Sequence, residues 1–170
     1  MITRGEHQMM SKDGIKIHQK GVYDIKDLVK SIQNYLEERK YTVQISTQSK
    51  NRDVGYEVLV GLKSERDMDD YSRFHINVSI LIIEMEKVKI KNKNLDKGDM
   101  NINFKANIFL DYKNRWNKNF ISRFLNLIYN NYIIKDKIKG DYERKVYLDL
   151  VNLHNLVKEK LGLYLHVYGT

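Results

Sequence analysis

The stretch from Asn101 to Tyr112 alternates apolar and polar residues with one exception, and it constrains the fold more than any other part of the chain. Its apolar positions share one parity: Ile102, Phe104, Ala106, Ile108, Leu110 and Tyr112. The positions between them are polar except for Phe109. Successive side chains of an extended strand point to opposite faces of a sheet, so this period of two predicts a half-buried β-strand with one wet face.

Four further segments are typical of strands. Residues 15–23 predict a first strand, and the alternation over 41–46 and 54–62 predicts an antiparallel hairpin around the polar turn at 50–53. Residues 72–92 predict a fourth strand with less regular apolar positions. A polar turn over residues 93–100, which contains Gly98, is expected to lead from it into the strand at 101–112.

Three segments repeat apolar residues at the spacing of a helix. The first begins after the N-cap candidate Asp24 and ends near Lys40, and the second begins after Asn117 or Asn119. The third ends at Gly162, the residue type favoured just after a helix, and the alternation over 163–168 predicts a short strand. The apolar stripes of the last two are Phe120, Ile121, Phe124, Leu125, Ile128 and Tyr132, then Val146, Leu150, Leu153, Val157 and Leu161.

The order β-α-β-β-β-β-α-α predicts an α+β fold. We expect an antiparallel sheet of about five strands, with one helix after the first strand and two C-terminal helices packed on the sheet. Residues 15–170 are expected to form a single domain after a flexible N-terminus at 1–14.

Composition narrows the class of protein. The chain has no cysteine and no apolar run long enough to span a bilayer, and its first fourteen residues lack the apolar core of a signal peptide, so a cytoplasmic protein is expected. No nucleophile elbow, glycine-rich phosphate loop or metal-ligand spacing occurs. We therefore expect no metal, no cofactor and no catalytic residue, and a protein that is not an enzyme.

The net charge of +8 favours an acidic partner such as nucleic acid, and the competing explanation is coding bias toward lysine together with solubility. Lys87, Lys89, Lys91 and Lys93 share one parity. If Ile90 pairs with Ile102, then Asn101, Asn103 and Lys105 join them on one face that could follow a phosphate backbone. The alternative is a solvated hairpin tip whose lysines discourage aggregation.

The same register predicts an inconsistency. Leu81, Ile83 and Met85 share the parity of the lysines, and Phe109 would lie opposite Ile83, which leaves an apolar patch on the wet face. Three explanations are open: a second subunit covers the patch as a dimer contact, a helix of the same chain covers it, or a β-bulge within residues 83–87 shifts the parity.

Two other groups are candidates for binding. Ile102, Phe104, Ile108 and Tyr112 could line a cavity if the helices curl over the apolar face. Tyr112, Arg115, Trp116 and Phe120 gather where the last long strand ends, and they form either an interaction site or the plug at one end of the sheet.

Three short motifs resemble a group of small archaeal proteins of unknown function. They are His18-Gln-Lys-Gly-Val-Tyr-Asp, Leu110-Asp-Tyr-Lys-Asn-Arg-Trp-Asn-Lys and Tyr132-Ile-Ile-Lys. The resemblance implies a cytoplasmic archaeal protein and no activity.

The sequence therefore supports two hypotheses. The first is a non-enzymatic interaction or scaffold protein, dimeric through the sheet, whose basic hairpin binds nucleic acid or a ribonucleoprotein. The alternative is a carrier that holds a small hydrophobic ligand in a cavity between the helices and the sheet.

Overall fold

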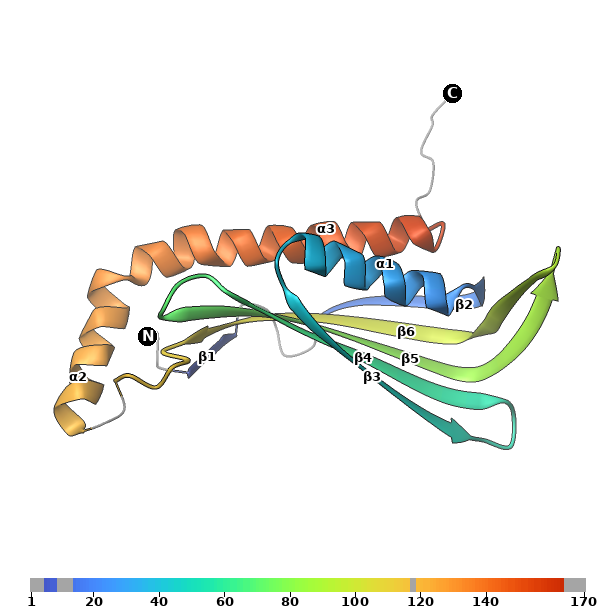
Figure 1. The fold of residues 1–170 in the computed structure, drawn as a ribbon, viewed down its shortest axis with the longest axis horizontal. Helices are drawn as coiled ribbons and strands as arrows, with labels where there is room; N and C mark the ends of the chain where they lie inside the picture. The colour runs from blue at the N-terminus through green and yellow to red at the C-terminus, as the bar shows by residue number, and fades with distance from the viewer. Residues whose placement is uncertain (1–4, 9–13, 117–118, 164–170) are drawn as a thin grey trace, which may run out of the picture.

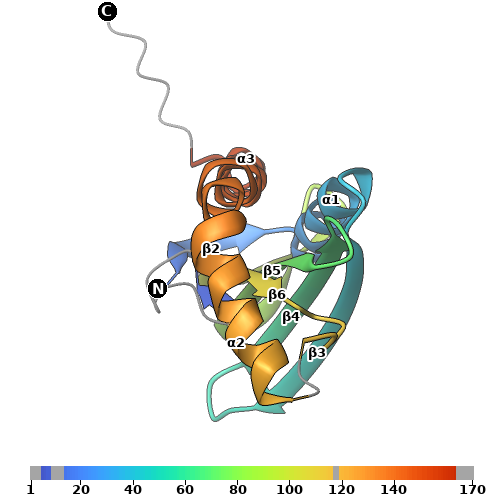
Figure 2. The same ribbon diagram turned by 90° about the vertical axis from the view of Figure 1, so that its left-hand side faces the viewer.

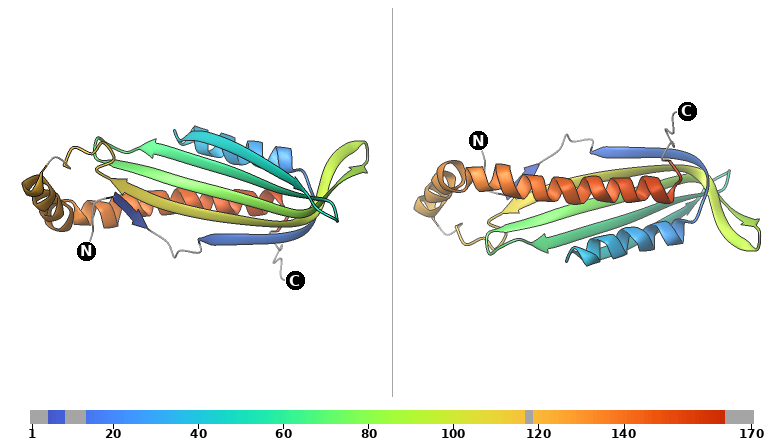
Figure 3. Two further views of the ribbon diagram at one scale, coloured as in Figure 1. Left: turned by 90° about the horizontal axis from the view of Figure 1, so that it is seen from below. Right: turned by 90° about the horizontal axis from the view of Figure 1, so that it is seen from above.

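The predicted α+β fold is confirmed by the computed structural model, which describes residues 5–8, 14–116 and 119–163 (Figure 1). Two helices lie side by side on one face of a six-stranded antiparallel sheet (Figure 3). The elements in chain order are β1 (Gly5–Gln8), β2 (Ile15–Tyr23), α1 (Ile25–Glu38), β3 (Thr42–Asn51), β4 (Tyr56–Asp67), β5 (Ser72–Ile90), β6 (Lys93–Leu110), α2 (Phe120–Ile128), the π-helices η1 (Tyr129–Ile133) and η2 (Lys137–Tyr142), and α3 (Glu143–Lys160).

The strands follow the order β1-β6-β5-β4-β3, and β2 also pairs with β6. β1 and β2 therefore occupy successive stretches of the same β6 edge, with Gly5 opposite Leu110 and Ile15 opposite Phe104. Residues 5–8, which lie within the N-terminus expected to be flexible over residues 1–14, form an edge strand. Its four residues have no alternation that sequence reasoning could detect.

The expected hairpin turn over residues 93–100 is wrong. The turn consists of Lys91 and Asn92, whose φ angles of 45° and 64° are both left-handed, as a two-residue type I′ turn requires. Ile90 therefore pairs with Lys93 instead of Ile102. Gly98 lies within β6, where a Cβ would come 2.9 Å from the carbonyl oxygen of Ile83.

A β-bulge explains the mixed parity of the fourth predicted strand. The pairing of β5 with β6 shifts between Ile83 and Glu86, and Glu84 has a φ of 53°. Two residues of β5, Glu84 and Met85, therefore lie opposite the single residue Gly98 of β6. Beyond the bulge, the odd-numbered and even-numbered residues of β5 exchange faces of the sheet.

The core lies between the sheet and the helices. Asp24 caps α1 by accepting a hydrogen bond from the backbone N–H of Asp27 at 3.0 Å, and Leu28, Ile32 and Leu36 then face the sheet. The predicted apolar stripe of α3 is buried through Val146, Leu150, Leu153 and Val157, which are all fully inaccessible. The sequence periodicity thus places both helices correctly. The short strand expected near the C-terminus lies largely outside the described residues.

Asp149 of α3 joins the two helices to the sheet. Its side chain accepts a hydrogen bond from the hydroxyl of Tyr41 at 3.0 Å and forms an ion pair with Arg66 of β4 at 3.2 Å. Its backbone carbonyl accepts a hydrogen bond from the hydroxyl of Tyr35 on α1 at 2.8 Å. Burial, followed by the charge of Asp149, raises the pKa of Tyr41 far above its usual range, so this hydroxyl remains a donor.

The last third of the chain forms a bent helical arc that turns around one end of the sheet, with α2 crossing that end (Figure 2). The two π-helices separate α2 from α3, as the hydrogen bond from Ile134 N to Tyr129 O at 3.0 Å shows. The second predicted helix is present and Asn119 caps it, but its apolar stripe does not face the sheet. Five of its six large apolar side chains are exposed, Leu127 is half-buried, and Asn126 is buried instead.

Candidate binding face of the sheet

One face of the sheet carries neither α1 nor α3, and we call it the open face (Figures 1 and 3). The alternation of β6 brings Asn101, Asn103 and Lys105 to this face, while Ile102 and Phe104 point into the core. This confirms the wet face that the sequence predicts for this strand. Cross-strand partners share a face, so the observed register extends the open face across the other strands.

The register arranges the open face in three neighbouring rows that run across the strands. The central row has small side chains over three strands: Ser46, Gly61, Ser79, Asn103 and Lys16. On one side of it is a row of longer polar side chains: Gln44, Lys63, Asn77 and Lys105. On the other side is a mixed row: Gln48, Leu59, Leu81, Asn101 and His18.

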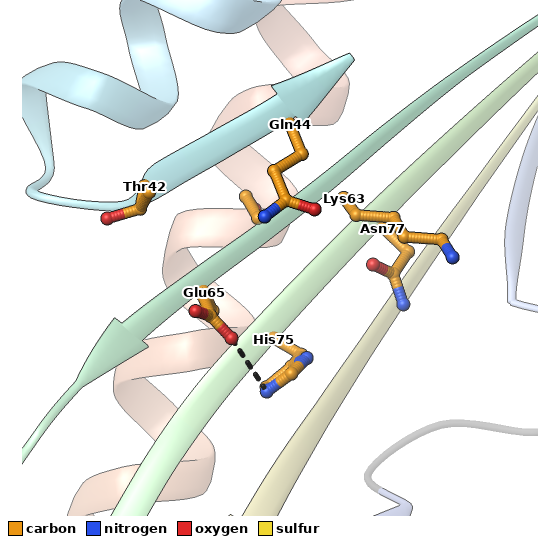
Figure 4. Close-up of a pocket in the computed structure, with 7 residues that line it drawn as sticks. Thr42, Gln44, Lys63, Glu65, His75 and Asn77 are labelled. Carbon is orange, nitrogen blue, oxygen red and sulfur yellow. Dashed lines mark ion pairs between the residues drawn. The ribbon is translucent and has the colours of Figure 1, made fainter. Parts of the chain in front are cut away.

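The small central row makes the floor of a groove of about 420 Å³ across the middle of the sheet. Gly61 adds no side chain to this floor, and a Cβ at this position would lie only 2.9 Å from the hydroxyl oxygen of Ser46. A second hollow of about 320 Å³ adjoins the groove and shares Lys63 and Asn77 with it (Figure 4). The two hollows together form a shallow polar trough, which we call the trough.

Free charge on the open face is mostly positive. Within the described parts of the chain, seven lysines of this face have no ion-pair partner: Lys16, Lys20, Lys50, Lys63, Lys93, Lys97 and Lys105. Among the described carboxylates of the same face, Glu86 beside Lys97 has no ion pair, whereas those nearer the trough are paired. Asp99 contacts His18 at 2.7 Å, and Arg73 contacts both Asp67 at 2.5 Å and Glu65 at 3.2 Å. The hydrogen bond from Arg73 lowers the pKa of Asp67, so that pair stays ionised at neutral pH.

An aromatic pair lies at one end of the trough. The rings of His75 and Phe109 are 4.3 Å apart with an interplanar angle of 45°. His75 also approaches Glu65 at 3.8 Å, as the dashed line in Figure 4 shows. Beside this pair, the guanidinium of Arg73 lies 4.3 Å from the centre of the Tyr112 ring. Phe109, the exception to the alternation, therefore has a partner on the open face.

The predicted row of four lysines is not on one face. Lys87 and Lys89 pair with Asp96 and Asn94 on the helix side of the sheet, because the bulge reverses their parity. Lys93 lies on the opposite side, and Lys91 is in the turn. Lys87 is moreover paired with the buried carboxylate of Asp96. Of the predicted binding residues, only Asn101, Asn103 and Lys105 belong to the trough and its borders.

The predicted apolar patch is divided as well. Leu81 and Ile83 lie on the open face, but Met85 is part of the bulge and is buried in the core. Phe109 is opposite Arg73 at the other end of β5, far along the strand from Ile83. Leu59 pairs with Leu81 instead, so a smaller patch of Leu59, Leu81 and Ile83 borders the trough. Of the three explanations in the sequence analysis, the bulge is the one that the structure shows.

Three of the four predicted cavity residues lie in the core, and the fourth, Tyr112, lies apart from them. Ile102, Phe104 and Ile108 are fully buried in the core, and the Phe104 ring packs edge-on against His154 of α3 at 5.7 Å. Tyr112 lies beyond the end of β6, where its hydroxyl donates to Asp67 at 3.0 Å. Both hollows described above are on the opposite side of the sheet from these core residues.

Sequence reasoning missed Lys63, Asn77 and the floor residues of the trough. The alternation of Val58, Val60 and Leu62 already indicates that Gly61 and Lys63 point away from the core. The pairing of Lys63 with Asn77, and of Asn77 with Lys105, depends on the register, which alternation alone does not specify.

No group of His, Asp or Glu side chains suited to hold a metal ion occurs among the described residues. Within the same residues, no helix is both long and apolar enough to cross a membrane. No protein-family model, no curated protein and no solved structure matches the chain.

Proposed function

We propose that the protein binds single-stranded nucleic acid in the trough of the open face and acts as a binding protein rather than as an enzyme. The observation that carries the proposal is the row in which Lys63, Asn77 and Lys105 stand side by side above a floor of small side chains. Lysine side chains bind phosphates as point charges, and amides offer donors and acceptors to base edges.

The spacing supports this role. Lys63 is on β4 and Lys105 is on β6, two strands apart, so their Cα atoms are separated by roughly 10 Å. Lys16 continues the positive charge one strand further. A flexible anionic chain that crosses the strands would thus meet successive unpaired cations, whereas the nearby carboxylates Glu65, Asp67 and Asp99 are paired with Arg73 and His18.

Single strands fit this face better than a duplex does. Sheet-face binders hold unstacked bases on aromatic or apolar side chains, and the trough has Phe109 with His75 at one end and Leu59 with Leu81 along its border. Duplex readers usually place a helix in the major groove, and both α1 and α3 lie on the other side of the sheet.

The test is fluorescence anisotropy with labelled single-stranded DNA and RNA oligonucleotides of twelve or so nucleotides, with a duplex of the same sequence alongside. We expect the single strands to bind more tightly, and the logarithm of affinity to fall with the logarithm of salt by about 0.7 for each phosphate contacted. Replacing Lys63 and Lys105 together with serine is expected to remove about two such contacts and to reduce the slope accordingly.

The matched control removes the same charge at the hairpin tip by changing Lys89 and Lys91 to serine. This variant is expected to retain most of the binding. If it loses binding while the Lys63/Lys105 variant retains it, the binding surface is the hairpin and the assignment to the trough is wrong. If no single strand binds at low salt, nucleic-acid binding itself is rejected.

A further inference from the structure

The helix α2 and the following η1 expose a continuous set of large apolar side chains, which we call the α2 face. Their exposed fractions run from 37% to 83% in Phe120, Ile121, Phe124, Leu125, Ile128, Tyr132 and Ile133. Figures 1 and 2 show α2 at one end of the molecule, away from α1 and from the β5–β6 hairpin. Single exposed apolar residues are common on protein surfaces, but seven within fourteen residues form a patch that indicates an interaction site.

A closed hydrogen-bond ring determines which side of α2 faces the protein. The hydroxyl of Tyr71 donates to Asn130 Oδ1 at 2.5 Å, and Asn130 Nδ2 donates to Asn126 Oδ1 at 3.1 Å. Asn126 Nδ2 then donates back to the hydroxyl oxygen of Tyr71 at 2.9 Å. Both amides are almost completely buried. Rotating α2 to bury its apolar side chains would leave these polar groups without partners, which costs free energy.

Aromatic contacts hold the same orientation. The ring of Trp116 stacks on that of Tyr129 at 5.7 Å, and Tyr71 meets Tyr129 edge-on at 5.4 Å. Trp116 is therefore part of the plug at this end of the sheet, whereas Phe120, four residues later, is left exposed. The α2 face is thus presented by specific contacts on the reverse side of the helix.

The size of the α2 face matches that of half a protein dimer interface. Aromatic side chains present ~150–250 Å² each and aliphatic ones less, so the exposed parts of the seven side chains come to roughly 800 Å². A standard interface buries about 800 Å² on each partner. Its three aromatic rings are also the residue type enriched at the centres of interfaces.

The charge of the α2 face favours a second copy of the chain over a membrane surface. Arg123 is the one charged residue between Phe120 and Ile133, and this segment contains no carboxylate. A helix that lies on a membrane has a polar side rich in lysine and arginine, but the polar side of α2 has one such residue, Arg123, and is otherwise made by Ser122, the buried Asn126 and Asn130 of the following turn. An almost uncharged apolar face can pack against an identical face with little desolvation cost.

The spacing of the residues is also compatible with two-fold symmetry. Phe120, Phe124 and Ile128 follow one another at four-residue intervals and form one ridge of the helix. In an antiparallel pair related by a two-fold axis near Phe124, Phe120 of one copy would meet Ile128 of the other. We propose that the α2 face is a homodimer interface in which two copies of this helix pack antiparallel, on a surface separate from the trough.

The test uses the absence of cysteine from the chain. A Leu125→Cys variant places one thiol near the proposed two-fold axis, and a Tyr147→Cys variant places one on α3 at a residue that is 51% exposed. Under mild oxidation at micromolar protein, we expect a covalent dimer from Leu125→Cys and mostly monomer from Tyr147→Cys. Equal yields from both variants would show random collision and would contradict the proposal.

Sedimentation equilibrium of the unmodified full chain gives the second readout. We expect a concentration-dependent dimer that becomes monomeric when Phe120 and Phe124 are both changed to serine. The matched control, Ile83→Ser on the open face, is expected to remain dimeric, and dissociation by this variant alone would place the interface on the sheet. A chain that stays monomeric throughout the micromolar range overturns the proposal, and Phe124-dependent sedimentation of that monomer with anionic vesicles would identify the α2 face as a membrane-docking surface instead.

Discussion

The helices α2 and α3 belong to one bent arc and both show apolar periodicity in the sequence, yet they present their apolar stripes to opposite environments. The stripe of α3 is fully buried against the sheet and α1, whereas that of α2 is exposed. The difference shows that periodicity predicts a helix and its apolar side, but not what that side contacts. In α2 the contact is decided by two asparagines and a tyrosine on the reverse side of the helix.

The largest effect is expected where the α3 stripe is disrupted. Leu153→Ala removes a fully buried side chain from the core, so we expect a loss of about 2–5 kcal/mol in the free energy of unfolding, measured by urea denaturation. Leu148→Ala, on the exposed side of the same helix, is the control and is expected to change stability little. Similar losses from the two variants would mean that α3 is not packed as described.

The next largest effect is expected from disrupting the hydrogen-bond ring that orients α2. Asn130→Ala leaves the Tyr71 hydroxyl and the Asn126 amide each short of a partner in a buried place, with an expected cost of about 1–3 kcal/mol. A double-mutant cycle with Tyr71→Phe isolates the coupling between the two residues. Additive losses would show that the ring does not orient α2.

The acid end of the stability profile tests how the arc is attached to the sheet. Burial tends to raise the pKa of Asp69, but hydrogen bonds from the Tyr142 hydroxyl and from the backbone N–H groups of Tyr71 and Ser72 outweigh it and lower the pKa. This carboxylate therefore stabilises the fold above its unfolded pKa of about 3.9, and the contribution is lost as pH falls through the lower folded value.

The measurement is the denaturation midpoint between pH 6 and pH 3 for the wild type and for Asp69→Asn. We expect the variant to be less stable at pH 6 and to lose less stability on acidification. Asp53→Asn, in the exposed β3–β4 turn, controls for the removed charge. Parallel profiles for all three proteins would contradict the role of Asp69.

A smaller pH effect is expected from His154, which lies on α3 beside the Phe104 ring. Burial, and then the charge of Lys158, lowers its pKa. The folded state disfavours the protonated ring, so stability should decline as pH falls from the unfolded pKa of about 6.5 toward the lower folded value. Thermal unfolding between pH 7.5 and pH 5 is expected to show this decline in the wild type and a weaker one in His154→Gln.

The smallest effect is expected from the exposed stripe of α2. In protein dilute enough to be monomeric, Phe124→Ser should change the free energy of unfolding by no more than about 0.5 kcal/mol, because the side chain packs against little within its own chain. A loss comparable to that of Leu153→Ala would mean that α2 buries its apolar side in the monomer.

Much of the fold could be predicted from the residues alone. The alternation of β6, the Asp24 cap of α1 and the Gly162 end of α3 all have local causes that a sequence displays. The bulge at Glu84 could be anticipated only as one of three explanations, because a shifted parity does not reveal its own cause. The turn at Lys91 and Asn92 could not be predicted because Gly98 is, by residue type, the stronger turn candidate. In the structure Gly98 lies within β6, where the lack of a side chain allows close contact with the backbone of Ile83.

The candidate site was harder to predict than the fold. Asn101, Asn103 and Lys105 were placed on the correct face by parity, but their neighbours depend on register, and the two-residue turn displaced the register by about ten positions. Lys63 and Asn77 meet only because β4 and β5 pair as they do. The exposed side of α2 was unpredictable for a different reason, since Tyr71 and Asn130 are far apart in the chain and their hydrogen bond has no sequence signature.

The most direct test of the comparison between α2 and α3 is the reactivity of single thiols placed on the two stripes of this cysteine-free chain. Phe124→Cys and Leu153→Cys would each be modified with a thiol reagent in dilute, monomeric protein, with the urea-unfolded variants as references. We predict that Cys at position 124 reacts about as fast as its unfolded reference. Cys at position 153 is expected to react at least roughly 100-fold more slowly than its own reference, because the structure must open before the reagent can reach it. Equal protection at both positions would show that α2 faces inward, and the account of its apolar face would be wrong.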